Sequence, residues 1–136
     1  MNSVANQSEP SPDDVKILLA EDEVLVRLML ADALRGQGFQ VFEAANADDA
    51  IVILRSMRVD VVATDLHMRV KGDGVLLAKY VREHCSSTPV LLASGHAPTS
   101  EGVLFDAFFV KPYRPEDIAN WIKRRGRTPD TAEALS

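Results

Sequence analysis

The sequence predicts an α/β fold in which a parallel β-sheet is covered by helices on both faces. Five short, almost wholly apolar runs recur along the chain, and stretches with the spacing of amphipathic helices separate most of them. Runs that stay apolar, instead of alternating with polar residues, are typical of strands buried on both faces. With 136 residues, 46% of them hydrophobic, the chain can bury such a core without disulfides or a structural metal.

The N-terminal half of the chain predicts two pairs of strand and helix. Lys16–Ala20 is an apolar run followed by three acidic residues, which indicates a strand leading into a helix. Apolar residues at helical spacing predict a helix over Val24–Leu34, and two glycines just after it favour its end there. A second strand is expected over Phe39–Ala44 and a second helix over Ala47–Met57.

The middle of the chain continues the alternation. Val59–Thr64 predicts a third strand, which ends directly before Asp65. Gly74–Glu83 has apolar residues on one side of a helix, and Pro89–Ala93 predicts a fourth strand.

The last strand and helix are predicted over Ala107–Val110 and Pro115–Arg125, the latter with proline in its first turn. Only the twelve residues 95–106 connect the fourth strand to the fifth. A connection that includes a helix needs at least about 10–12 residues, and Pro98 disfavours a helix here. A helix at this place is therefore expected to be short or absent.

The chain is expected to form one domain over residues 14–126. Residues 1–13 and 127–136 are polar and have no periodic apolar face, so they are predicted to be flexible tails. The N-terminus has neither the basic start nor the apolar stretch of a secretory signal.

Composition argues against several partners. A formal net charge of −5 disfavours non-specific binding to nucleic acid or to anionic lipid. No apolar run approaches the roughly 18 residues that a membrane span needs. The single cysteine, Cys85, excludes an internal disulfide framework and favours a cytoplasmic location.

Polar residues follow four of the five predicted strands. In a parallel α/β sheet, ligands bind beyond the carboxyl ends of the strands. Glu21 and Asp22, Asp65, Ser94 and Lys111 stand at these ends. Each alone has an ordinary explanation, such as a helix cap, a turn or a solvated charge. Together they predict a magnesium site, because three neighbouring carboxylates repel one another without a cation and oxygen ligands suit Mg²⁺. A lysine and a hydroxyl beside that cation are suited to holding a phosphoryl group.

The same residues carry a family resemblance. The chain from Val15 to Arg125 resembles the receiver domain of bacterial two-component response regulators, of the CheY-like kind. The matching runs, in order, are LLAEDE at 18–23, VVATD at 61–65, LLASG at 91–95 and FFVKP at 108–112. The resemblance implies a flavodoxin-like (βα)₅ fold, doubly wound, with strand order 2-1-3-4-5.

The resemblance also implies roles for the acidic residues. Asp65 resembles the phosphoacceptor, a carboxylate that attacks the phosphorus of a phosphohistidine. Asp22 would bind Mg²⁺ directly, and Glu21 would act as an outer acidic partner. The backbone carbonyl of His67 would complete the protein's share of the magnesium ligands.

Three further residues match functional positions of the family. Lys111 would place its ammonium group on a phosphoryl oxygen. Ser94 stands where the family has the hydroxyl that moves toward the phosphoryl group, and Phe108 stands at the aromatic position that moves with it. The bond between Lys111 and Pro112 matches one that is usually cis in the family.

The chain departs from the family pattern in two places. Arg69 replaces a proline four residues after the acceptor, and Gly74 falls nine residues after it instead of eight. This altered loop is expected to affect dephosphorylation and kinase contacts more than phosphorylation itself. Residues 89–96, PVLLASGH, resemble the run PFxFATGY of the FAT GUY receivers, whose fourth helix is short or disordered. That subgroup implies HWE or related histidine kinases.

The function implied is that of a stand-alone receiver, not of a conventional enzyme. It would take a phosphoryl group from a sensor histidine kinase or a histidine phosphotransfer protein. It would then signal to a downstream protein by direct contact or by phosphorelay, with residues 95–106 as the mobile output element. One alternative is a pseudo-receiver scaffold that is not phosphorylated. The other is a phosphohydrolase with an aspartate nucleophile, which is disfavoured because His67 stands where such enzymes need a second carboxylate.

Overall fold

The structure is a computed structural model that describes residues 14–70, 72–97, 102 and 104–125. Five parallel strands form one sheet in the order β2-β1-β3-β4-β5. The strands are β1 (Lys16–Ala20), β2 (Gln40–Ala44), β3 (Val61–Thr64), β4 (Val90–Ser94) and β5 (Ala107–Val110). The helices are α2 (Val24–Gly36), α3 (Ala47–Ser56), α4 (Asp73–His84) and α5 (Pro115–Arg125). The predicted fold class and strand order are confirmed.

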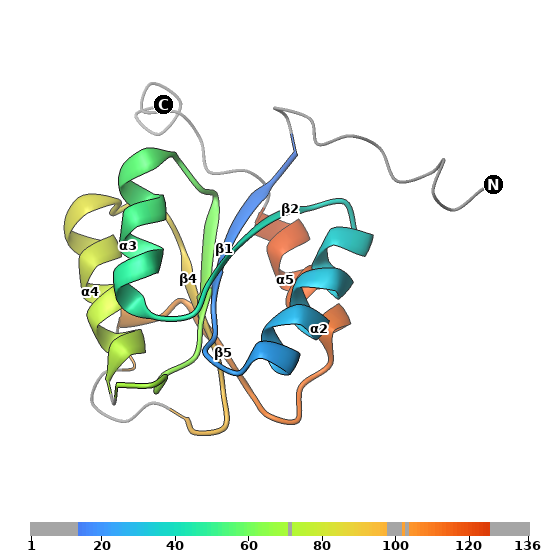
Figure 1. Cartoon of the computed structure of the whole chain (residues 1–136). Helices are drawn as coiled ribbons and strands as arrows, with labels where there is room; N and C mark the ends of the chain where they lie inside the picture. Colours follow the sequence, from blue (N-terminus) through green and yellow to red (C-terminus); the bar gives the residue numbers. More distant parts are fainter. Residues whose placement is uncertain (1–13, 71, 98–101, 103, 126–136) are drawn as a thin grey trace.

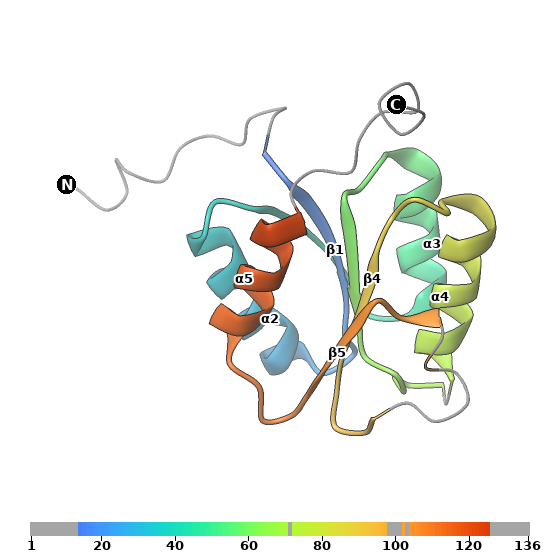
Figure 2. The same ribbon diagram turned by 180° about the vertical axis from the view of Figure 1, so that it is seen from behind.

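Helices cover both faces of the sheet. In Figures 1 and 2, α2 and α5 lie together on one side, and α3 and α4 lie together on the other. Successive residues of a strand point to opposite faces, so Ile17 and Leu19 pack toward α2 and α5 while Leu18 packs toward α3 and α4. The central strands are buried on both faces, which is why their sequences read as continuous apolar runs.

Local sequence explains where several helices begin and end. Asn46 caps α3, because its side-chain oxygen accepts a hydrogen bond of 2.8 Å from the backbone N–H of Asp49. Gly38, just past the end of α2, has φ 97°, and Gly72, just before α4, has φ 87°. Glycine adopts these left-handed conformations at no steric cost.

The connection from β4 to β5 differs from the other connections of the fold. Among its residues that the structure describes, 95–97, 102 and 104–106, none belongs to an α-helix. Arg82 of α4 binds the C-terminal part of this connection. Its Nε and Nη2 atoms donate hydrogen bonds of 3.1 and 2.8 Å to the carbonyl of Leu104. Nη2 also pairs with Asp106 at 2.7 Å. The α4 side of β5 is only partly covered, and Phe108 is 52% exposed.

Some predictions fall on parts of the chain that the structure does not describe. The two tails, residues 1–13 and 127–136, lie outside the described residues, and so do residues 98–101 and 103 of the proposed output element. The domain limits and the mobility of that element stay predictions. Within the described ranges, no helix is long and apolar enough to cross a membrane.

Candidate functional site

The predicted site residues meet at the carboxyl edge of the sheet, which is the lower end of the molecule in Figure 1. Glu21 and Asp22 follow β1, Asp65 follows β3, Ser94 is the last residue of β4, and Lys111 follows β5. The parallel register aligns these ends, since Ala20 pairs with Thr64 and Ser94 pairs with Val110. The structure therefore brings together the residues that the sequence singled out.

Three carboxylates form the centre of the site. One oxygen from each of Glu21, Asp22 and Asp65 lies within 4.8 Å of the others. Glu21 and Asp65 are buried, with 3% and 8% of their surface exposed, and Asp22 is half-buried. Carboxylate oxygens are the hard ligands that Mg²⁺ prefers, and a cation there would relieve the repulsion among them. The three residues thus fit a divalent cation site.

Lys111 lies against two of these carboxylates. Its Nζ atom is 3.3 Å from Oε1 of Glu21 and 3.4 Å from Oδ2 of Asp65. Burial lowers the pKa of Lys111, but the charges of Glu21 and Asp65 raise it more, so its pKa is above the ordinary value. The ammonium group is therefore held in its charged form between the two buried acids.

Glu21 has the largest change in proton affinity at the site. Its pKa is raised from 4.5 to about 7, mainly by burial and in part by the negative charge of Asp65. The backbone N–H of Glu23, which donates to Oε2 of Glu21 at 3.1 Å, and the Lys111 ammonium act in the opposite direction. A bound divalent cation would favour the carboxylate form of Glu21.

The loop after β1 is fixed by contacts of its backbone. The N–H of Glu21 donates to the carbonyl of Ala44 at 3.0 Å. The Nη1 atom of Arg27 donates to the carbonyl of Glu21 at 2.8 Å. Arg27 was not predicted as a site residue from the sequence. A signal was present, because a cation in the first turn of a helix interacts unfavourably with the helix dipole and so indicates a specific contact.

The loop after β3 packs tightly against the start of α4. The N–H of Asp65 donates to the carbonyl of Ala20 at 3.1 Å, and the N–H of Gly74 donates to the carbonyl of Leu66 at 2.9 Å. A Cβ atom at Gly74 would lie 2.0 Å from the carbonyl oxygen of Asp65, so only glycine fits there. The longer loop thus still brings a glycine against the backbone of Asp65.

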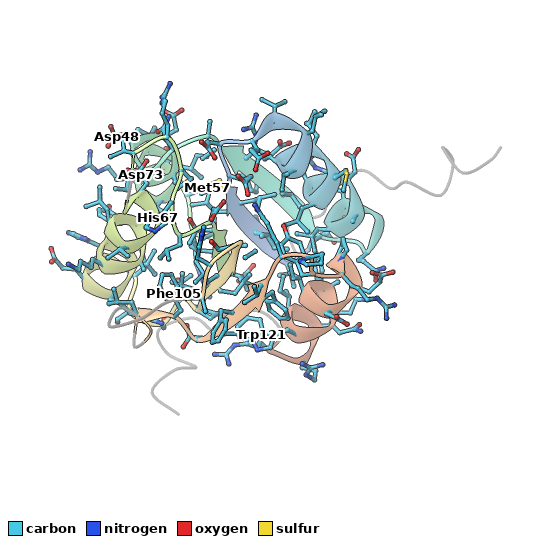
Figure 3. The ribbon with its side chains drawn as sticks, turned by 90° about the horizontal axis from the view of Figure 1, so that it is seen from below. Asp48, Met57, His67, Asp73, Phe105 and Trp121 are labelled. Atoms are coloured by element: carbon cyan, nitrogen blue, oxygen red, sulfur yellow. The ribbon has the colours of Figure 1, made fainter. Side chains whose placement is uncertain are left out.

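Two histidines lie beside the site. His67 is half-buried, and its Nδ1 atom accepts a hydrogen bond of 3.1 Å from the N–H of Gly72. Its ring centroid is 6.2 Å from that of His96. Figure 3, seen from below, looks onto this edge of the sheet and shows His67 on the side of α3 and α4. The assignment of the His67 carbonyl as a magnesium ligand stays a prediction.

Ser94 and Phe108, the two predicted switch residues, lie on neighbouring strands. Ser94 is buried, and its Oγ atom accepts a hydrogen bond of 3.3 Å from the N–H of His96. The carbonyl of Ser94 accepts from the N–H of Lys111 at 2.8 Å. Phe108 points outward, as its exposure shows. The bond between Lys111 and Pro112 is cis, as the resemblance implied.

The chain is similar to several known response regulators. Regulatory protein AtoC of Escherichia coli (strain K12) is 31% identical over 115 residues, which cover 80% of this chain and 24% of AtoC. The chemotaxis response regulator CheY4 of Vibrio cholerae is 27% identical, with a TM-score of 0.74, and the similarity covers 82% of this chain and 98% of CheY4.

A third protein, the response regulator TrrA of Thermotoga maritima, was solved in complex with Mg(2+)-BeF. It is 21% identical, with a TM-score of 0.73 over 81% of this chain and 97% of TrrA, and at this identity it shows the fold alone. The chain spans between a quarter and a little over half of the length of the curated relatives that it matches.

A family assignment follows from the extent of the match. Residues 17–123 match the response regulator receiver domain. They include the whole sheet and the acidic residues at its carboxyl edge. The chain therefore belongs to the response regulator receiver domain family, whose members are partners of histidine kinases and are not conventional enzymes.

Proposed function

We propose that the chain accepts a phosphoryl group on Asp65 from the phosphohistidine of a sensor histidine kinase or a histidine phosphotransfer protein. The contact of Lys111 with Asp65 at 3.4 Å, beside a cluster of three carboxylates, is the observation that carries the proposal. A fixed positive charge thus lies beside the carboxylate that would take up the phosphoryl group. A pseudo-receiver scaffold has no need for this arrangement.

The chemistry would use each group in a distinct way. A carboxylate oxygen of Asp65 attacks the phosphorus, the bond from phosphorus to the histidine nitrogen breaks, and an acyl phosphate forms. The freed imidazole keeps the electron pair of the broken bond and takes a proton from water. Lys111 offsets negative charge on the phosphoryl oxygens during the transfer. Mg²⁺ held by Asp22 and Asp65, with Glu21 as an outer partner and the His67 carbonyl as a further ligand, would supply additional positive charge to those oxygens.

A protein donor has to bring its phosphohistidine to this edge of the sheet. The start of α2, directly after the acidic residues, is exposed and apolar, with Leu25 and Met29 the most exposed of its side chains. Neighbouring exposed apolar side chains mark protein contact sites. We propose that the donor packs there, and the FAT GUY resemblance favours HWE or related kinases as that donor.

Phosphorylation would change another part of the surface, which a downstream protein would contact. Ser94 and Phe108 lie on neighbouring strands, and Phe108 and Val110 are exposed on the α4 side of β5. A hydroxyl drawn toward phosphorylated Asp65 would leave room for Phe108 to turn inward. This change would alter the surface that a downstream protein meets, either for direct contact or for phosphorelay.

Intact-mass measurement tests the proposal. The purified chain is incubated with Mg²⁺ and a small phosphodonor such as acetyl phosphate. We expect a gain of one phosphoryl group that is absent in Asp65→Asn. Asp60→Asn is the matched control, because Asp60 is also buried but lies at the opposite end of β3. No gain in the wild type would support a pseudo-receiver, and catalytic release of phosphate from many donors would support a phosphohydrolase.

A further inference from the structure

Arg27 of α2 is bound on two sides by parts of the chain that precede and follow the helix. Its Nη1 atom donates to the carbonyl of Glu21 at 2.8 Å, and its Nε atom donates to Oε1 of Glu43 on β2 at 3.2 Å. Only 16% of its side chain is exposed. An arginine that is largely shielded from water needs partners to offset the lost hydration, and here the two partners fix the plane of its guanidinium group.

The charge of Arg27 interacts unfavourably with the dipole of its own helix, so its position needs another explanation. Arg27 lies in the first turn of α2, where the helix dipole disfavours a cation and favours an acid. The first turn of α2 contains no acidic residue. The helix itself therefore gains nothing from this charge, and the contacts with Glu21 and Glu43 account for its placement.

The contact with Glu21 acts on the backbone of the acidic loop. The carbonyl that Arg27 holds belongs to the peptide unit that joins Glu21 to Asp22. Because a peptide unit is planar, fixing its oxygen also fixes the direction in which the main chain enters Asp22. The carboxylates on both sides of this unit belong to the cluster whose oxygens lie within 4.8 Å of one another.

We propose that Arg27 is a positioning residue for the divalent cation site, and that Glu43 orients it. The inference rests on the proposed function, since it assumes that the carboxylate cluster binds Mg²⁺. Arg27 does not touch the cation. It holds the peptide unit between Glu21 and Asp22 in the orientation in which both side chains face Asp65.

The proposal predicts an effect opposite in sign to that of simple electrostatics. Arg27 carries a positive charge, so its removal should strengthen Mg²⁺ binding if only long-range charge matters. If Arg27 positions the loop, its removal should weaken binding, because residues that orient metal ligands contribute to metal affinity. The direction of the change therefore separates the two accounts.

The experiment is a titration of the full chain with MgCl₂ at fixed pH and ionic strength, followed by the amide NMR signals of the acidic loop. We expect Arg27→Gln to raise the Mg²⁺ dissociation constant by about tenfold or more. Arg35→Gln is the matched control. Arg35 lies on the same helix and pairs with Glu43 at 3.1 Å, but it bonds the carbonyl of Val41 instead of the acidic loop. Its loss should change the constant by less than about twofold.

Further variants keep the test decisive if Arg27→Gln folds poorly. Glu43→Gln removes the charged partner of the guanidinium. Because the loss of a negative charge alone also weakens Mg²⁺ binding, its readout is the amide signals of Glu21 and Asp22 without metal, which should shift if the guanidinium no longer holds this peptide unit. Arg27→Lys keeps the charge but cannot reach two partners in the same planar geometry, so it should restore binding only in part. Unfolding by urea, measured on each variant, separates loss of the fold from loss of the site.

Each outcome has one meaning. If the wild type shows no Mg²⁺-dependent shifts at Glu21, Asp22 and Asp65, the proposed function is wrong. If the wild type binds Mg²⁺ and Arg27→Gln binds it equally well or more tightly, the positioning role is overturned and the proposed function stands. Full recovery in Arg27→Lys would overturn the orienting role of Glu43, because a single donor to the Glu21 carbonyl would then suffice.

Discussion

Glu21 is the residue whose proton affinity the fold changes most at the site. Burial raises its pKa from 4.5 to about 7, so the folded state binds a proton more tightly than the unfolded state does. Between these two values the folded chain holds more protons, and its free energy of unfolding therefore falls as the pH rises. The loss is on the order of 3 kcal/mol in the absence of Mg²⁺.

The expected pH dependence of stability can be measured by urea unfolding in the presence of a chelator. We predict that the wild type loses stability between pH 4.5 and pH 7 relative to Glu21→Gln, which cannot ionise at this position. Saturating Mg²⁺ should reduce the difference, because the cation stabilises the carboxylate. If the free energy of unfolding of the two proteins without metal varied with pH in the same way, the pKa of Glu21 would not be raised.

Lys111 contacts Asp65, the proposed phosphoacceptor, and is not itself the proposed nucleophile. We predict that Lys111→Ala folds and still takes up a phosphoryl group, at a rate lower by about tenfold or more. The response should be uncoupled from uptake, since the ammonium group no longer reaches the phosphoryl oxygens. Uptake is measured by intact mass over time, and the response by amide NMR shifts in β5. A variant with normal uptake and normal shifts would contradict the role assigned to Lys111.

The loop between β3 and α4 shows how one element positions another. Because Gly74 falls one residue later than in the family pattern, the sequence predicted an altered loop beside the site. The structure shows Gly74 against the Asp65 carbonyl all the same, because Gly72 turns the chain in a left-handed conformation just before α4. The extra residue is taken up within the loop.

Gly74→Ala tests this packing. The added Cβ atom would lie 2.0 Å from the carbonyl oxygen of Asp65, so either the loop after β3 or α4 has to move. We predict a loss of about 1–3 kcal/mol in the free energy of unfolding and weaker phosphoryl uptake. Gly36→Ala is the control, since a Cβ atom at Gly36 meets nothing within 4 Å. Equal stability and uptake in both variants would contradict the close approach.

Helix and strand limits could be predicted to within one or two residues, since apolar runs and turn residues determine them locally. The third strand begins at Val61 and not at Val59, although Val59 is buried, because burial and strand pairing are different properties. Ser94 is the last residue of β4 and not the first residue after it. Such differences are within the usual ambiguity of element ends.

The contacts between elements could not be predicted in the same way. The five polar residues of the site were found because parallel strands end at one edge. The contact of Lys111 with both Glu21 and Asp65, and that of Arg27 with Glu21, join residues on different elements. These contacts depend on the distances between packed elements, and the spacing of residues along the sequence does not determine those distances. The length of the connection from β4 to β5 predicted that its helix would be short or absent. The hydrogen bonds of Arg82 to the carbonyl of Leu104 could not be predicted.

For the whole molecule, Mg²⁺ should act as a stabilising ligand of the native state. A cation that binds only the folded chain adds roughly 2.7 kcal/mol at about 100 times its dissociation constant. We predict a higher melting temperature with MgCl₂ than with an equal ionic strength of NaCl. Asp65→Asn should raise the stability without metal, because it removes one of the repelling charges. A melting temperature that does not respond to Mg²⁺ would contradict the cation site.

The most direct test of the account is the location of the phosphoryl group. An aspartyl phosphate is reduced by borohydride to homoserine, which marks the modified residue permanently. After treatment with acetyl phosphate and Mg²⁺, then with borohydride, peptide mass spectrometry of the wild type should show homoserine at position 65 and at no other aspartate. Modification of Asp22 instead, or an unmodified peptide throughout, would contradict the assignment of Asp65 as the phosphoacceptor.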